Sequence, residues 1–239
     1  MMFVSRRGLL VLGIAAGLFF GVMGCMPRPG VPDGGIASPE DLWQNRIERP
    51  VRPRPAVLSG SVRFGTAGET TRASFLWRSN GLLPASVILT DPVGTTAARI
   101  DVSDVESIVF VPSEKRAYRY GKGETQLGLP CGYAELACLL AGDYFSFLGS
   151  PAEKTMLSRT DEETKWSFAG EKGKGVLHIT HAGPLIVEKD GWKLEINERD
   201  GLPARLDAVK EDYRFVMVIR ERMPSEEFAP GVFISPERV

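Results

Sequence analysis

The sequence predicts a mainly β domain of about 11 antiparallel strands, in a sheet long enough that it must curl or close, with a helical segment inserted between its two halves. Two observations predict this fold class. From residue 57 onward, apolar and polar side chains alternate with a period of two, which is typical of strands with one buried face. One stretch, residues 133–141, breaks this alternation and consists largely of helix-forming residues.

The first 24 residues are organised like a secretory signal. Arg6 and Arg7 precede an uncharged apolar run of about 14 residues, which is too short to span a membrane comfortably as a helix. The run ends in Val-Met-Gly-Cys at residues 22–25, which resembles the lipobox of bacterial lipoproteins. The resemblance implies cleavage before Cys25, lipidation of that cysteine and anchoring to a membrane. The alternative is an ordinary signal or an uncleaved anchor.

The composition of the mature chain limits the classes of partner. Removing 24 of the 239 residues leaves 215, which suits one domain and a linker. Loss of Arg6 and Arg7 reduces the 29 basic residues to 27 against 30 acidic ones, a net charge of −3. Because this charge is nearly balanced, we expect no nucleic-acid partner, and we expect a monomer.

Residues 25–56 are expected to form a tether that begins at the lipidated cysteine. The segment contains seven prolines, and Pro-rich chains extend into semi-rigid spacers. A short helix can interrupt it, because Ser38 is a candidate N-cap, Pro39 suits the first helical position and Asp41 supplies an acid at the third. That helix must end before Pro50.

The β domain is expected to span residues 57–239. Asn80-Gly81 predicts a two-residue hairpin. A further turn is expected at residues 91–94, Asp-Pro-Val-Gly. The candidate strands of the first half lie at residues 58–64, 71–77, 83–89, 95–101, 106–111 and 116–120.

The middle of the chain predicts two helical segments. Residues 133–141 contain no helix breaker, and Gly142 suits the C-cap; residues 143–148 form a second apolar turn or short helix. Both should cover a hydrophobic surface. A disulfide between Cys131 and Cys138 would need Cys131 to lie outside the helix, because two helical turns separate Cα atoms by ~10 Å and a disulfide needs less than about 7 Å. The alternative is two free, buried cysteines.

The second half of the chain returns to strand periodicity. Asp190-Gly191 and Asp200-Gly201 predict tight turns. In the last strand Tyr213, Phe215, Met217 and Ile219 share one face. The candidate strands lie at residues 155–159, 165–169, 175–180, 185–188, 192–197, 204–209 and 213–220.

Four short segments carry a resemblance to a known family. Residues 75–77, Phe-Leu-Trp, look like its aromatic-rich second strand, and residues 89–95 look like its Asn-Pro-Leu-Gly loop, with Asp91 in place of Asn and Val93 in place of Leu. Residues 130–142 look like its segment of Pro, Leu-rich helix and Gly, and residues 191–206 like its late Trp strand followed by Pro. Together they resemble the LolA/LolB lipoprotein carriers, most closely the membrane-anchored LolB branch.

The resemblance implies a half-open barrel with an apolar cavity under a helical lid. It implies an outer-membrane-anchored lipoprotein, facing the periplasm, that receives the acyl chains of lipoproteins from a LolA-type carrier and helps transfer them into that membrane. Met26 is consistent with this location. Val93 is the expected membrane or donor contact. The expected cavity-lining residues are Val62, Phe64, Phe75, Trp77, Val87 and Leu89, and the expected lid residues are Leu136, Leu139, Leu140 and Phe145.

No motif in the sequence predicts catalysis, a cofactor or a metal. His178 and His181 are three residues apart, so in a strand they face opposite sides and cannot converge on one ion. The Gly-Lys turns lack the spacing of a P-loop, and no Gly-x-Ser-x-Gly motif occurs. We therefore expect a protein that is not an enzyme. The alternatives are a tethered carrier of another lipid or apolar ligand, and an envelope assembly lipoprotein that binds a protein partner.

Overall fold

The computed structural model describes residues 38–121, 124, 129–181 and 183–233. The predicted signal peptide and Cys25 lie outside these residues. One compact unit begins at Ser38. Within the described ranges, no helix combines the length and the apolar character needed to cross a membrane.

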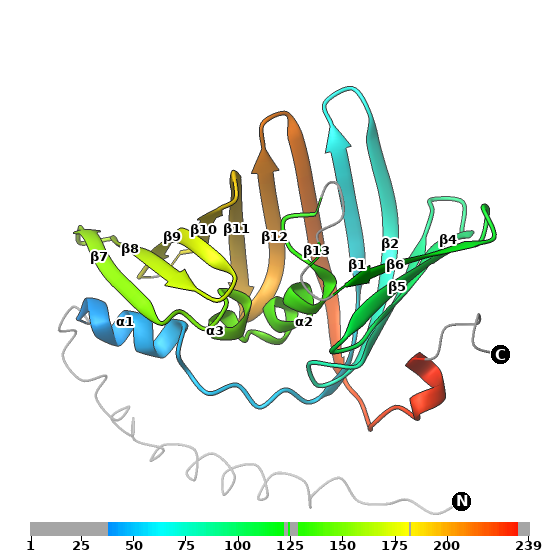
Figure 1. Cartoon of the computed structure of the whole chain (residues 1–239), viewed down its shortest axis with the longest axis horizontal. Coiled ribbons are helices and arrows are strands. Elements are labelled where there is room, and N and C mark those ends of the chain that lie inside the picture. The colour runs from blue at the N-terminus through cyan, green and yellow to red at the C-terminus, as the bar shows by residue number, and fades with distance from the viewer. Residues whose placement is uncertain (1–37, 122–123, 125–128, 182, 234–239) are drawn as a thin grey trace, which may run out of the picture. The chain divides into compact units, whose positions relative to one another are not determined.

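The domain is one open, curled antiparallel sheet of 13 strands (Figure 1). The spatial order is β6-β5-β4-β3-β2-β1-β13-β12-β11-β10-β9-β8-β7, so every neighbouring pair except β1 and β13 is consecutive in sequence. The predicted class is confirmed, and the expected count of about 11 strands is corrected to 13. The sheet does not close, because β6 and β7 are both edges.

The strands have regular bounds that follow the period-two pattern of the sequence. They are β1 Pro55–Thr66, β2 Thr70–Asn80, β3 Ala85–Thr90, β4 Thr96–Val102, β5 Glu106–Val111, β6 Arg116–Gly121, β7 Glu153–Arg159, β8 Glu163–Gly170, β9 Gly173–Thr180, β10 Leu185–Lys189, β11 Trp192–Arg199, β12 Leu202–Lys210 and β13 Tyr213–Pro224.

An apolar row crosses the concave face of seven neighbouring strands, β8 to β13 and β1, because the register aligns one apolar side chain from each of them. Residues directly opposite each other in an antiparallel sheet lie on the same face. Starting from β8, the partners in this row are Trp166, Leu177, Val187, Leu194, Ala208, Phe215 and Phe64. The core therefore lies on the concave side.

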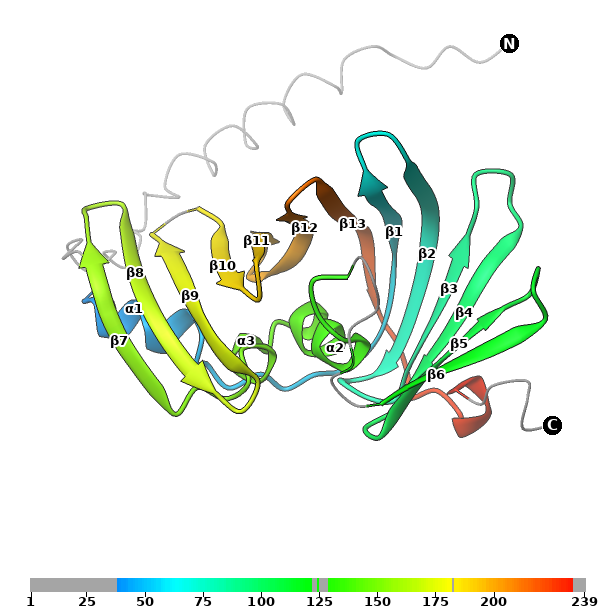
Figure 2. The same ribbon diagram turned by 45° about the horizontal axis from the view of Figure 1, so that its top comes forward.

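Helices α2 (Tyr133–Ala141) and α3 (Tyr144–Phe147) lie on this concave side, between the two arms of the sheet (Figure 2). They connect β6 to β7, as the inserted helical segment was predicted to do. Gly142 ends α2 with a left-handed backbone, φ 79°, which glycine adopts without a Cβ clash. The predicted helix and its C-cap are confirmed.

Helix α1 (Pro39–Arg46) begins at the predicted capping box. Ser38 accepts a hydrogen bond from the backbone N–H of Asp41, and the Asp41 carboxylate accepts one from the backbone of Ser38. The helix is not a free part of the spacer, however, since Trp43 is 0% exposed and its ring centroid lies 5.3 Å from that of Trp166 on β8. The predicted short helix is therefore present and packs against the sheet, and the role of residues 25–56 as a tether stays a prediction.

The two turn predictions in the second half are confirmed, and β2 and β3 pair as the predicted hairpin, but the two-residue turn predicted at Asn80-Gly81 is wrong. Asp190 and Gly191 both have positive φ, 52° and 79°, as a tight two-residue hairpin requires. Asp200 and its following glycine repeat this geometry. The segment between β2 and β3 is longer, because Asn80 still belongs to β2 and its side chain binds the backbone of Phe228 through two hydrogen bonds of 3.0 and 2.7 Å.

Candidate functional site

The concave face of β1–β4 and β13 holds an apolar pocket. Among the described residues that line it, none carries a charge. All six residues predicted to share a cavity line this one pocket. The described residues that line it are Val62, Phe64, Phe75, Trp77, Val87, Leu89, Ile100, Leu129, Tyr133, Leu136, Phe215 and Met217.

Strand register brings the lining together. Phe75 lies opposite Leu89, and Trp77 lies opposite Val87, so β2 and β3 contribute two adjacent pairs to one wall. The other wall comes from β13, because Met217 lies opposite Val62 on β1. This last pairing joins the two ends of the domain, and the sequence analysis did not assign Met217 or its neighbour Phe215 to the cavity.

Helix α2 covers the apolar pocket with Tyr133 and Leu136. The remaining cavity is about 110 Å³, smaller than the ~300–1,000 Å³ of typical small-molecule sites. Burial raises the pKa of the Tyr133 hydroxyl, so the side chain stays neutral. A ligand as large as an acyl chain would therefore have to displace these covering side chains.

The other predicted lid residues lie in three different places. Leu139 is fully buried in the core, and Leu140 lines a separate pocket at the end of the sheet. Phe145 is only half-buried and lies outside the lining of the apolar pocket, so its assignment there is corrected. The reason is the orientation of α3, which turns Tyr144 and Phe147 inward instead.

Polar contacts hold both ends of α2. At its N-terminus the Glu135 carboxylate accepts a 2.8 Å hydrogen bond from the backbone N–H of Gly132 and lies 3.6 Å from the Lys172 ammonium. At its C-terminus the Arg222 guanidinium donates a 2.9 Å hydrogen bond to the carbonyl of Leu140. The two hydrogen bonds satisfy backbone groups that the helix itself leaves unpaired.

A buried network ties α3 and α1 to the sheet. The Tyr144 hydroxyl donates a 2.7 Å hydrogen bond to the carboxylate of Glu198 on β11. The same carboxylate pairs with Arg46 of α1, and that guanidinium also donates to the carbonyls of Thr180 and Gly183. Burial and this hydrogen bond raise the pKa of Tyr144, which keeps the hydroxyl a donor.

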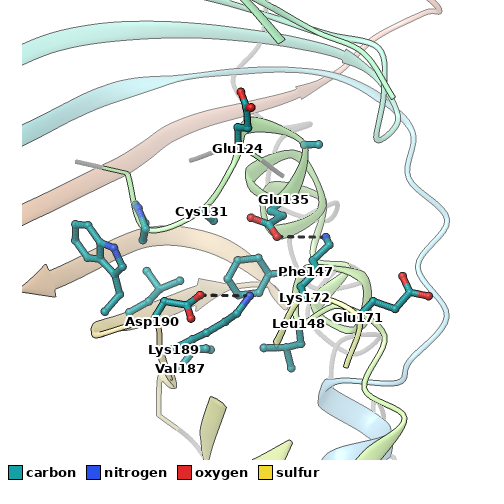
Figure 3. Close-up of a pocket in the computed structure, with 14 residues that line it drawn as sticks. Glu124, Cys131, Glu135, Phe147, Leu148, Glu171, Lys172, Val187, Lys189 and Asp190 are labelled. Atoms are coloured by element: carbon teal, nitrogen blue, oxygen red, sulfur yellow. Dashed lines mark ion pairs between the residues drawn. The ribbon is translucent and has the colours of Figure 1, made fainter. Parts of the chain in front are cut away.

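A second pocket, of about 570 Å³, lies on the other side of α2 (Figure 3). Its floor is apolar, with Phe147, Leu148 and Val187 among its residues, but its rim is charged. Both lysines of the rim have acidic neighbours: Lys172 has Glu135, and Lys189 lies 3.8 Å from Asp190. Helix α2 thus lies between the apolar pocket and this larger pocket, which has an apolar floor and a charged rim.

The thiols and imidazoles of the described part of the chain have the following surroundings. Cys131 and Cys138 are free, and burial raises the pKa of both thiols, which disfavours the nucleophilic thiolate. His178 lies between Glu163, at 2.7 Å, and Glu188, at 3.5 Å. Among the residues that the structure describes, no group of three or more His, Cys, Asp or Glu side chains is arranged to hold a metal ion.

Val93 protrudes from the turn between β3 and β4, with 86% of its surface exposed. The Asp91 carboxylate shapes this turn by accepting hydrogen bonds from the backbone N–H groups of Val93, at 3.0 Å, and Thr95, at 2.8 Å. Gly94 completes the turn with φ 89°. The turn therefore presents an isolated apolar side chain to solvent.

Comparison with known proteins shows the fold. The structure is similar to a LolA superfamily protein from Nitrosomonas europaea, with a TM-score of 0.58, 13% identity, and coverage of 83% of this chain and 98% of that one. It is also similar to a domain described as that of an outer membrane lipoprotein-sorting protein from Vibrio parahaemolyticus, with a TM-score of 0.58, 10% identity, and coverage of 81% and 94%.

A third similar structure is a DUF1329 family protein from Desulfovibrio piger, with a TM-score of 0.56, 11% identity, and coverage of 76% of this chain and 90% of that one. No protein-family model matches the sequence, and no curated protein matches it. The chain therefore has the fold of the LolA superfamily.

Proposed function

We propose that the chain is a non-catalytic carrier that binds acyl chains in the apolar pocket and, anchored through Cys25, helps transfer lipoproteins into the outer membrane. The observation that carries the proposal is the lining of that pocket, in which the described residues come from five strands and α2 and none is charged. A pocket with an apolar lining favours a ligand that has no polar groups to satisfy.

An acyl chain that passes from a carrier to a membrane moves between two environments that exclude water. Each acyl methylene left in water costs about 0.8 kcal/mol. A carrier must therefore keep the chain covered until the membrane accepts it. On this account Tyr133 and Leu136 cover the pocket when it is empty and swing away with α2 when the acyl chain enters. The ligand would be released without any bond being made or broken.

The superfamily fold supports the proposal, because two of the similar structures are described as a LolA superfamily protein and as a lipoprotein-sorting domain. The lipobox-like sequence at residues 22–25 adds the membrane anchor that distinguishes the LolB type. The proposed location is accordingly the periplasmic side of the outer membrane, with a soluble LolA-type carrier as donor.

The direct test is ligand detection by native mass spectrometry. The mature chain from residue 26 onward, which cannot be lipidated, is purified without detergent and analysed for bound lipoprotein acyl chains. A polarity-sensitive fluorescent fatty acid then serves as the displaceable probe. The proposal predicts a bound acyl species, and displacement of the probe by a triacylated lipoprotein.

The matched variants are Phe75→Glu, inside the pocket, and Ser74→Glu, on the opposite face of the same strand. Phe75→Glu should abolish probe binding because it buries a charge in an apolar hollow, whereas Ser74→Glu should leave it unchanged. Circular dichroism checks that both variants fold. Absence of bound lipid and of probe fluorescence in the folded wild-type chain would contradict the proposal.

A further inference from the structure

A third pocket, of about 270 Å³, opens at the end of the sheet where the segment between α1 and β1 passes α2. Figure 1 shows this segment running along the ends of the strands beneath the two central helices. The interior of the pocket is apolar, formed by Leu58, Trp77, Leu140 and Leu202 among others. Its mouth is formed by residues 51–56, Val-Arg-Pro-Arg-Pro-Ala.

The charged residues that the structure describes in this pocket are of one sign. Arg52, Arg54 and Arg222 all line it, and no aspartate or glutamate is among the described lining residues. Within the described residues none of these three guanidinium groups forms an ion pair, and Arg222 instead donates to the carbonyls of Leu140 and Pro203. Burial lowers the pKa of Arg222, as expected for a cation without a neighbouring carboxylate.

This arrangement differs from the mixed rim of the 570 Å³ pocket, where lysines already face acids. Three arginines without acidic partners over an apolar floor attract an anion. The guanidinium fork matches the paired oxygens of a phosphate or carboxylate, and a charge-assisted hydrogen bond of this kind is about twice as strong as a neutral one.

The arginine-lined pocket adjoins the apolar pocket. Trp77, only 2% exposed, lines both and forms a wall between them. Helix α2 also covers both, since Tyr133 and Leu136 face the apolar pocket while Ala137 and Leu140, about one turn further along, face the other. A ligand that displaces α2 from the apolar pocket would therefore reach the arginines as well.

We propose that the arginine-lined pocket binds the anionic head, a phosphate or carboxylate, of a single amphiphile whose acyl chain occupies the apolar pocket. The ligand class is thus an anionic acyl lipid, which goes beyond the uncharged diacylglyceryl group of a lipoprotein. The inference rests on the proposed function only for the position of the acyl chain. The selectivity for the head comes from Arg52, Arg54 and Arg222.

The test compares two amphiphiles that share one chain, dodecyl phosphate and dodecylphosphocholine, each below its critical micelle concentration. In the second, the choline cation neutralises the phosphate. The mature chain should bind dodecyl phosphate about tenfold more tightly, by displacement of the fluorescent fatty acid and by calorimetry. Inorganic phosphate alone, at the same concentration, should displace nothing, because it lacks the chain.

The key variant is the double substitution Arg52→Gln with Arg54→Gln. Both side chains are exposed, so the fold should tolerate their replacement. The double variant should lose most of the preference for dodecyl phosphate and still bind dodecylphosphocholine. The charge-matched control is Arg72→Gln with Arg159→Gln, two exposed arginines outside all three pockets, and it should keep the preference.

Equal binding of the two amphiphiles by the wild-type chain, or an unchanged preference in the double variant, overturns this inference alone. Inorganic phosphate that binds as tightly as dodecyl phosphate also overturns it, in favour of a site for the free anion. If neither amphiphile binds, the acyl-chain proposal fails together with it.

Discussion

Phe75 on β2 lies directly opposite Leu89 on β3, and both side chains line the apolar pocket. Phe75 is buried at the centre of the wall, whereas Leu89 is half-buried. Both residues therefore belong to one wall of the pocket, but the fold depends more on the buried Phe75 than on the half-buried Leu89. A substitution at Leu89 can therefore change ligand binding with little effect on folding.

Leu89→Glu should weaken binding of a fluorescent fatty acid by about tenfold or more, because a charge at the wall of an apolar hollow must be desolvated when the chain enters. Thr90→Glu, on the opposite face of the same strand, is the control and should bind as the wild type does. Probe titration measures both. A Leu89→Glu protein that folds and binds normally would show that acyl chains do not contact this wall.

Val93→Glu should leave folding and acyl binding unchanged and slow delivery to membranes several-fold. The side chain is almost fully exposed, so its replacement changes stability by less than about 0.5 kcal/mol. A charge at this position opposes insertion into the membrane interface. The assay follows transfer of a labelled lipoprotein into liposomes. Val105→Glu, in the exposed turn at the other end of β4, should deliver normally, and a deficit of equal size there would contradict a specific role for Val93.

Trp43→Ala should lower the free energy of unfolding by about 3–5 kcal/mol, the usual cost of truncating a buried Trp. Trp43 packs against Trp166, and its indole N–H donates a 2.6 Å hydrogen bond to Glu48. Urea unfolding of the mature chain measures the change. An effect below 1 kcal/mol would mean that α1 belongs to a spacer after all.

Asp207→Asn should destabilise the protein more at pH 7 than in acid. Burial of the Asp207 carboxylate opposes its charge, but hydrogen bonds from Arg214 and Arg205 outweigh this and hold its pKa below the ordinary value. Its contribution is therefore complete above the unfolded-state pKa of about 3.9 and is lost as the pH falls through the lower folded pKa. Urea midpoints at several pH values test this. A difference between variant and wild type that stays constant from pH 7 to pH 2.5 would refute it, and Asp161→Asn in an exposed loop is the control.

Local signals predicted much of this fold. The capping box of Ser38 and Asp41, the C-cap at Gly142 and the turn at Asp190 each depend on residues close in sequence, and each is confirmed. The alternation of the strands placed the six predicted side chains on one face, and the structure places all six around one pocket. Their binding of acyl chains stays a prediction.

Long-range relationships could not be predicted from the sequence. Phe215 and Met217 were recognisable as one apolar face, but their place in the cavity depends on the pairing of β13 with β1, which no local turn indicates. Phe145 was misplaced because α3 has only four residues, too few to define a face, and a hydrogen bond from Tyr144 to Glu198 fixes its orientation.

The cluster of arginines in the third pocket could not be predicted from the sequence, for a related reason. Arg52 and Arg54 alternate with prolines, and this composition is typical of a spacer. Only the folded chain brings them beside Arg222, which lies on the last strand, and beside Trp77 on the second. A pattern within one segment cannot indicate a cluster that three separate segments build.

The measurement that tests the central claim most directly is photocrosslinking of a fatty acid that carries a diazirine near its methyl end. The mature chain is irradiated with bound ligand, digested and analysed by mass spectrometry. The account predicts labels concentrated in the peptides of β1, β2, β3, β13 and α2 that line the apolar pocket, with loss of labelling in Leu89→Glu. Labels spread over the convex face of the sheet, or confined to its edge strands β6 and β7, would contradict it.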